Sequence, residues 1–296
     1  MRRPHVRPQF TTTLEGYLFL APFLVVYCLF RIYPVFRGIY ISLFDWDLVG
    51  VYRHYVGLEN YREMLHDDRF WSSLWHTVYF VLLSTPLIVI VGLLLAVAVN
   101  RTMRGMAIFR TIFFAPYALS ISVVTLIWVM VLNASPNRGF VANFMTDLGL
   151  QPIRWLTDQQ LAMPAIVITT LWWTVGFNML LFLAGLQDIP KEVYEAARID
   201  GAGRWALLRS ITLPLLRPTL ILVAILQVIA SFQIFGQVYL MTRGGPANAT
   251  RVLVQYIYET GFRDWFLGYA SAVSVVLFGI MFMISLLQVR FSPKTT

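Results

Sequence analysis

The chain has 296 residues, of which 58% are hydrophobic and only 13% charged, and its mean hydropathy is +0.68. A soluble domain carries about a quarter charged residues, so this composition excludes an ordinary soluble protein and indicates one that lies in a membrane. The formal net charge of +8 is explained by the membrane topology described below and requires no nucleic-acid partner.

The apolar runs predict an all-α membrane protein with six transmembrane helices. Crossing a hydrocarbon core requires roughly 20 helical residues, and the runs lack the apolar–polar alternation of a membrane barrel. The first run reaches this length if Arg31 and Arg37 extend toward the surface, and we interpret it as an uncleaved span because no small-residue cleavage site follows. In a single domain, 1–296, we expect spans at about 15–43, 76–100, 108–132, 162–186, 218–241 and 266–289.

The distribution of basic residues predicts the orientation of these spans. Arginines and lysines cluster before the first span, between the second and third, between the fourth and fifth, and after the sixth. Basic segments stay on the cytoplasmic side, so both termini are expected in the cytoplasm. The first outer loop, at about 45–75, is acidic and contains an expected surface helix near 58–65.

No enzyme chemistry is indicated by the sequence. The only lysines, Lys191 and Lys294, do not follow the glycines of a phosphate-binding loop, and Gly201–Ala206 fits a dinucleotide fingerprint without the strand that such a site requires. Cys28 is a lone cysteine, and the four histidines lack metal-ligand spacing. We therefore expect no catalytic residues, no metal and no cofactor in this chain.

A charged segment interrupts the apolar runs at 188–216 and contains the stretch "EVYEAARIDGAGRWALLRSITLP". A short helix is expected over 191–200, followed by a left-handed cap at Gly201. A second helix is expected over 205–212, with Pro214 and Pro218 stopping it.

The two short helices of this segment have different faces. The first has a flat face with small residues, and the second has an apolar ridge that could press on membrane helices. From the residues alone, this is either an amphipathic helix at the inner interface or an elbow that docks into a cytoplasmic partner. The face consists of Val193, Ala196, Ala197 and Asp200, and the ridge of Leu207, Leu208, Ile211 and Leu215.

The spacing of this segment resembles the EAA motif of ABC importer permeases. Glu195-Ala196-Ala197, three residues, Gly201, nine residues and then Ile211-Thr212-Leu213-Pro214 match E-A-A-x3-G-x9-I-x-L-P throughout. The longer stretch, together with "SFQIFGQVYLMTRGGPANAT", is similar to the carbohydrate branch, which includes maltose-type and glycerol-3-phosphate-type permeases. The resemblance extends over nearly the whole chain.

The resemblance implies a type I ABC importer permease in the cytoplasmic membrane of a prokaryote. It implies a second, related permease as partner in a heterodimer, two ATP-binding cassette subunits that hold ATP and Mg²⁺, and an extracytoplasmic substrate-binding protein. The charged segment would be the coupling helix that docks on the ATPase. Its expected docking, turn and base residues are Glu195, Ala196, Ala197, Asp200, Gly201, Ile211, Leu213 and Pro214.

Polar and aromatic side chains within the spans are candidates for contact with a substrate. Amide and hydroxyl groups beside aromatic rings suit a sugar, although such amides also bond neighbouring helices. The candidates are Asn178, Gln227, Ser231, Gln233, Gln237, Trp172 and Trp173.

The expected function is import of a sugar or oligosaccharide. The spans contain no mid-membrane arginine or lysine that would hold a strongly anionic substrate. A permease for glycerol-3-phosphate or a related polyol phosphate is the alternative within the same architecture. An ion-coupled carrier is disfavoured because the interior of the spans contains no Asp or Glu that could relay protons. A receptor or scaffold would show no substrate flux.

Overall fold

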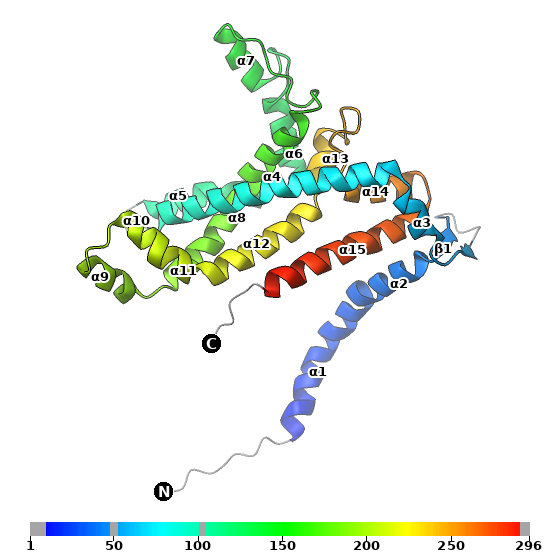
Figure 1. Ribbon diagram of the computed structural model, residues 1–296, viewed down its shortest axis with the longest axis horizontal. Helices are drawn as coiled ribbons and strands as arrows, with labels where there is room; N and C mark the ends of the chain where they lie inside the picture. Colours follow the sequence, from blue (N-terminus) through cyan, green and yellow to red (C-terminus); the bar gives the residue numbers. More distant parts are fainter. Residues whose placement is uncertain (1–9, 48–52, 101–104, 291–296) are drawn as a thin grey trace. The chain divides into compact units, whose positions relative to one another are not determined.

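The computed structural model describes residues 10–47, 53–100 and 105–290, and is predominantly helical (Figure 1). The described residues fall into two compact units. Of the described residues, the first unit contains 10–47, 53–64 and 260–276, and the second contains 65–100, 105–259 and 277–290.

The first unit begins with one long apolar helical segment. It consists of α1 (Phe10–Tyr27), a π-helical turn η1 (Cys28–Ile32) and α2 (Tyr33–Ile41). Pro34 lies in the first turn of α2, where the missing N–H of proline is tolerated. The part Gly16–Ile41 has the length and hydropathy of a membrane span, and none of its most apolar window is buried within the structure.

A short antiparallel hairpin follows this segment and was not predicted from the sequence. It pairs β1 (Phe44–Trp46) with β2 (Arg53–Tyr55), with Phe44 opposite Tyr55. The predicted surface helix is confirmed as α3 (Glu59–Leu65). It supports the hairpin because the Asn60 side-chain amide donates to the carbonyl oxygens of Ser42 at 2.8 Å and Phe44 at 2.9 Å.

The second unit is built on three long helices that lie side by side, namely α4 (Asp68–Val99), α8 (Ala162–Gln187) and α12 (Arg217–Phe232) (Figure 1). Small residues allow the close approach of α4 and α8: a side chain added at Gly92 would lie 3.2 Å from Asn178 Cβ, and Ala96 is fully buried. Their contact encloses a core that includes Met179, Phe182 and Val223.

Shorter elements complete the second unit and lead into the last helix. They are α5 (Met106–Phe114), η2 (Ala115–Ala118), α6 (Ile121–Val131), α7 (Phe140–Asp147), α9 (Lys191–Ile199), α10 (Arg204–Leu207), η3 (Leu208–Thr212), α11 (Leu213–Leu215), α13 (Gly236–Met241), α14 (Leu253–Tyr258) and η4 (Glu259–Arg263). The last helix, α15 (Leu267–Arg290), starts in the first unit and ends in the second.

Within the described residues, four to six segments are long and apolar enough to cross a membrane. Four candidates are single helical segments: Gly16–Ile41, Asp68–Val99, Ala162–Gln187 and Leu267–Arg290. Two more are bent pairs, Met106–Ala118 with Ile121–Val131 at 99° and Arg204–Leu215 with Arg217–Phe232 at 67°.

Two expected spans are not continuous helices. The segment 108–132 breaks at Leu119, directly after the 3-10 turn η2 that contains Pro116, and the backbone of Leu119 is extended with ψ of 145°. The segment 218–241 breaks between Phe232 and Gly236, so its last six residues form the separate helix α13.

Candidate translocation pathway and coupling segment

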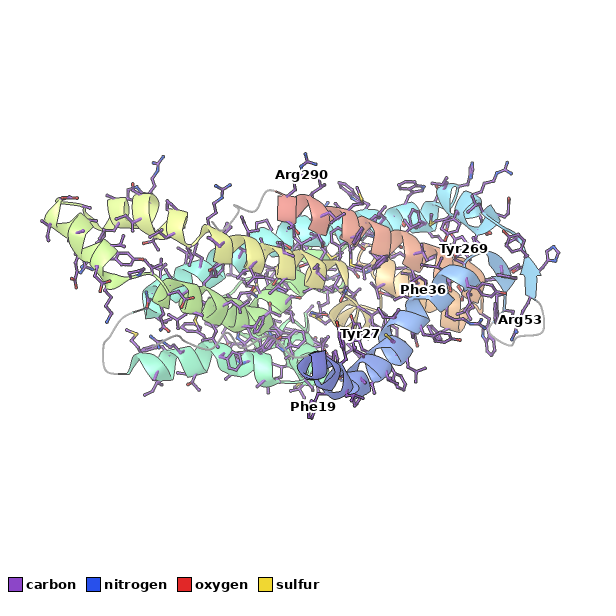
Figure 2. The ribbon with its side chains drawn as sticks, turned by 90° about the horizontal axis from the view of Figure 1, so that it is seen from below. Phe19, Tyr27, Phe36, Arg53, Tyr269 and Arg290 are labelled. Carbon is purple, nitrogen blue, oxygen red and sulfur yellow. The ribbon has the colours of Figure 1, made fainter. Side chains whose placement is uncertain are left out.

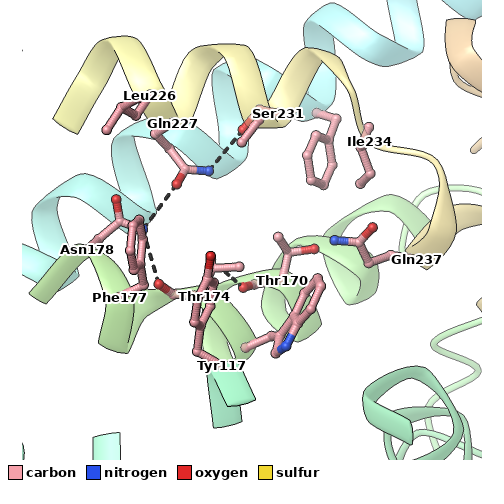
Figure 3. A pocket seen from close by; sticks show the side chains of 13 residues that line it. Tyr117, Thr170, Thr174, Phe177, Asn178, Leu226, Gln227, Ser231, Ile234 and Gln237 are labelled. Carbon is pink, nitrogen blue, oxygen red and sulfur yellow. Dashed lines mark hydrogen bonds between the residues drawn. The ribbon is translucent and has the colours of Figure 1, made fainter. Parts of the chain in front are cut away.

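A cavity of about 240 Å³ lies within the second unit, bounded by α4, α8, α12, α13 and the turn η2. Figure 3 shows its lining, which combines aromatic rings, amides and hydroxyls. None of the thirteen lining residues is charged. They are Phe80, Tyr117, Thr170, Trp173, Thr174, Phe177, Asn178, Leu226, Gln227, Ala230, Ser231, Ile234 and Gln237.

Tyr117, Trp173 and Phe177 form an aromatic wall. The rings of Tyr117 and Phe177 stack with centroids 4.8 Å apart and 13° between their planes. Trp173 holds its place by donating its indole N–H to the carbonyl oxygen of Leu119 at 3.2 Å. The turn η2 thus carries Tyr117 against α8, and the carbonyl oxygen of Leu119 at the break accepts the Trp173 hydrogen bond.

A chain of polar side chains forms the opposite wall. Asn178 Nδ2 donates to Gln227 Oε1 at 3.2 Å, and Gln227 Nε2 donates to Ser231 Oγ at 3.1 Å. Ser84 and Thr85 of α4 reach the same Ser231 hydroxyl at 3.2 and 3.3 Å. These hydrogen bonds join α8 to α12 (Figure 3), and Ser84 and Thr85 connect α4 to the same network.

Five of the seven side chains expected to contact substrate line this cavity: Asn178, Gln227, Ser231, Gln237 and Trp173. Gln233 is exposed outside it, and its amide lies 4.0 Å from Met281 Sδ. Trp172 is also outside and packs edge-on against Trp128, with centroids 5.9 Å apart. Phe80, Tyr117 and Phe177 are the lining aromatic residues that the sequence interpretation missed. For Tyr117, the proline that precedes it within an apolar run was an available signal.

Replacing Gln227 with leucine is expected to weaken both folding and transport. The substitution removes the acceptor for Asn178 and a donor to Ser231, and stranding buried polar groups costs about 1–3 kcal/mol each. We expect a lower melting temperature of the purified permease and reduced uptake in proteoliposomes. Gln233→Leu is the matched control, because its amide is exposed and outside the cavity; equal effects of the two substitutions would contradict the assignment.

The charged segment folds as a helix, a tight turn and a second helix. After α9, Gly201 has a φ of +82°, the left-handed conformation expected from the sequence, and Ala202 N donates to Ala197 O at 2.9 Å. The first helix (α9) and the second helical part (α10, η3 and α11), here called the second arm, contact each other where the Tyr194 hydroxyl lies 3.2 Å from Thr212 Oγ1. Thr212 in turn donates to Leu207 O at 3.1 Å within the π-helical turn η3.

The second arm differs from the expectation in two respects. Pro214 does not end the helix: α11 continues to Leu215, and the bend falls at Leu216 before α12. The expected ridge is also shifted, because Leu215 is 48% exposed while Leu216 is fully buried. The π-helical turn supplies the reason, since its extra residue rotates the following side chains around the helix axis.

The residues expected to dock on the ATPase are mostly accessible. Glu195, Ala196, Asp200 and Gly201 are exposed, and Ala197 is half-buried. Of the expected base, Ile211 and Leu213 are half-buried and Pro214 is exposed. Two apolar side chains that the sequence interpretation did not select, Ile199 and Trp205, are 87% and 72% exposed beside the turn.

Residues 64–296 match the binding-protein-dependent transport system inner membrane component family. The chain belongs to this family. The permease is 37% identical to the sn-glycerol-3-phosphate transport system permease protein UgpA of Brucella abortus, over 96% of this chain and 97% of that one. It is 36% identical to the trehalose/maltose transport system permease protein MalF of Thermococcus litoralis, over 93% and 92% of the two chains.

A solved structure shares the fold of the permease. A chain of a bacterial alginate ABC transporter, crystallised with its alginate pentasaccharide-bound periplasmic protein, superposes with a TM-score of 0.83 at 23% identity, covering 94% of this chain and 93% of that one. The permease is thus the membrane subunit of an ABC importer, in a family of transport components rather than of catalytic enzymes.

Proposed function

We propose that the permease forms the pathway for an uncharged sugar or oligosaccharide. The observation that carries this proposal is the cavity lining: an aromatic wall faces a chain of amides and hydroxyls, and no lining residue is charged. A sugar ring has apolar faces that suit aromatic rings and hydroxyls that exchange hydrogen bonds with amides. Relatives named for trehalose/maltose and lactose transport support this substrate class.

A glycerol-3-phosphate permease is the second candidate, because relatives with that printed function are among the most similar. A phosphate group in a protein is usually held by arginine, lysine or a helix N-terminus. The cavity lining contains no such cation, so its chemistry favours a neutral substrate.

The remaining features of the proposal concern topology and partners. Each bent helix pair would be one span, which makes six spans with both termini in the cytoplasm of a prokaryote, and the two units would form one transmembrane domain. A second, related permease would complete the pathway, two ATPase subunits would hold ATP and Mg²⁺, and an extracytoplasmic binding protein would deliver the substrate. The segment from α9 to α11 would couple the ATPases to the spans through Glu195, Ala196, Ala197, Asp200 and Gly201.

The proposal is tested by uptake into proteoliposomes that contain the complete transporter and ATP. With the cognate binding protein present, we expect saturable uptake from a panel of labelled mono- and oligosaccharides and no uptake of glycerol-3-phosphate. Omitting ATP or the binding protein should abolish uptake. Preferential uptake of glycerol-3-phosphate would establish the second candidate, and uptake without the ATPase subunits would contradict the importer mechanism.

A further inference from the structure

The hairpin of the first unit gathers aromatic side chains on one face. Side chains alternate across a strand, so Phe44 and Trp46 share a face of β1. Phe44 contacts Trp46 and Tyr55 edge-on, with ring centroids 6.3 and 5.4 Å apart, and Tyr40 of α2 at 4.6 Å. The register places Arg53 opposite Trp46. This face is therefore aromatic and carries an arginine.

The opposite face of the hairpin is polar. Asp45 alternates with its neighbours in β1 and pairs in register with His54 of β2. Alternation directs both side chains away from the aromatic face. The carboxylate of Asp45 is exposed and forms no ion pair with Arg53.

Two guanidinium groups lie over the ring of Trp46. The Cζ atom of Arg53 is 4.2 Å from the ring centroid, and that of Arg37 in α2 is 5.1 Å from it. The two charges cannot be further apart than the sum of these distances. Both side chains are exposed, while Trp46 itself is 8% exposed. Within the described part of the chain, neither arginine forms an ion pair with a carboxylate.

This arginine pair is situated at the end of an apolar helical surface. The segment Gly16–Ile41 buries none of its most apolar window within the structure, and Figure 2 shows Phe19, Tyr27 and Phe36 projecting from it. Figure 2 also shows Arg53 projecting from the hairpin. Aromatic rings such as those of Tyr40 and Tyr55 are typical of the level where acyl chains meet headgroups.

We propose that Arg37, Trp46 and Arg53 bind the phosphate of an anionic phospholipid whose acyl chains lie along α2. Guanidinium groups bind phosphate oxygens through paired, charge-assisted hydrogen bonds. Two like charges held near one ring repel each other, and a shared anion relieves that repulsion. The proposed topology places this site in the outer leaflet, but the lipid contact does not depend on that orientation.

The proposal is tested by measuring lipids retained on the purified, assembled transporter. Native mass spectrometry in mild detergent, with added phosphatidylglycerol or phosphatidylcholine, would report the bound lipids. We expect Arg37→Gln with Arg53→Gln to weaken phosphatidylglycerol binding about tenfold, as two charge-assisted contacts are lost. Arg62→Gln is the matched control, because Arg62 is an exposed arginine of the same unit that already faces Glu59 at 3.9 Å.

The outcomes distinguish a phospholipid site from a site that accepts any anion. Equal retention by the native and doubly substituted transporters would overturn the proposal, as would equal binding of phosphatidylcholine and phosphatidylglycerol. Displacement of the lipid by inorganic phosphate at the same concentration would show a simple anion site and would also overturn it. If the double variant does not assemble, Arg53→Gln alone decides, because Arg53 lies outside the apolar helix; it should still lower phosphatidylglycerol binding several-fold.

Discussion

Replacing Gly201 with valine is expected to abolish transport and binding-protein-stimulated ATP hydrolysis while leaving the membrane helices folded. Gly201 has a φ of +82°, and a side chain added there would have no neighbour within 4 Å. The substitution therefore causes no clash but makes the left-handed turn unfavourable, because a β-branched residue rarely adopts a positive φ. The exposed residues before the turn, including Glu195, would then lose their orientation relative to α10.

The effect should appear as loss of ATPase subunits on co-purification, with an unchanged melting temperature of the membrane part. Gly201→Asn is the matched control, because asparagine tolerates the left-handed region; it should retain most of the activity. Glu195→Lys tests the docking surface independently, because Glu195 is exposed and its charge reversal leaves the turn intact. Normal assembly and normal ATPase stimulation by both Gly201→Val and Glu195→Lys would contradict the coupling role.

Replacing Gly176 with valine is expected to disrupt the cavity wall and to destabilise the permease by about 1–3 kcal/mol, the usual cost of overpacking a well-packed core. A Cβ at Gly176 would lie 2.0 Å from the carbonyl oxygen of Phe113, which is backbone and cannot rotate away. Helix α8 would have to move away from α5, which contains Phe113, and from η2, which contains Tyr117. The stacking of Tyr117 on Phe177 would be lost with that movement.

A fall in melting temperature and loss of sugar uptake would be measured on the same preparation. Gly279→Val is the matched control, because Gly279 also lies within a long helix, α15, and a side chain there meets no atom within 4 Å. Valine has a slightly better helix propensity than glycine, so this control should be neutral. Native stability of Gly176→Val would mean that α5 and α8 are less closely packed than the structure shows.

The sequence predicted features that depend on local chemistry or on length alone. The left-handed turn at Gly201 follows from a glycine at the end of a short helix, and the apolar lengths of α4, α8 and α15 needed no tertiary information. The three-residue strands could not be predicted from local sequence. The carbonyl oxygen of Phe44 in β1 accepts a hydrogen bond from the side-chain amide of Asn60, which lies sixteen residues further along the chain.

The breaks within two spans explain the errors at the cavity. A regular helix through 218–241 would place Gln233 and Gln237 near one face. The structure ends α12 at Phe232 and restarts at Gly236, so Gln237 lines the cavity and Gln233 does not. Close packing accompanies these breaks: a side chain at Gly236 would lie 2.4 Å from Ile121 Cδ1 of α6. Contacts of this kind join residues far apart in the chain and leave no periodic signal.

The uninterrupted course of α8 has a mechanical consequence. From Ala165 to Gln187 it contains no proline, and it carries Trp173 and Asn178 at the cavity and ends just before α9. Asn178 and Gln187 are nine residues apart along this helix, about 14 Å at the usual rise. If the segment from α9 to α11 docks on the ATPases as proposed, a displacement of α9 that moves α8 would shift Trp173 and Asn178 together, because both side chains belong to this one helix. Gln227 belongs to α12, so the same displacement would strain the hydrogen bond from Asn178 to Gln227 and would change the cavity lining on both of its chemical sides at once.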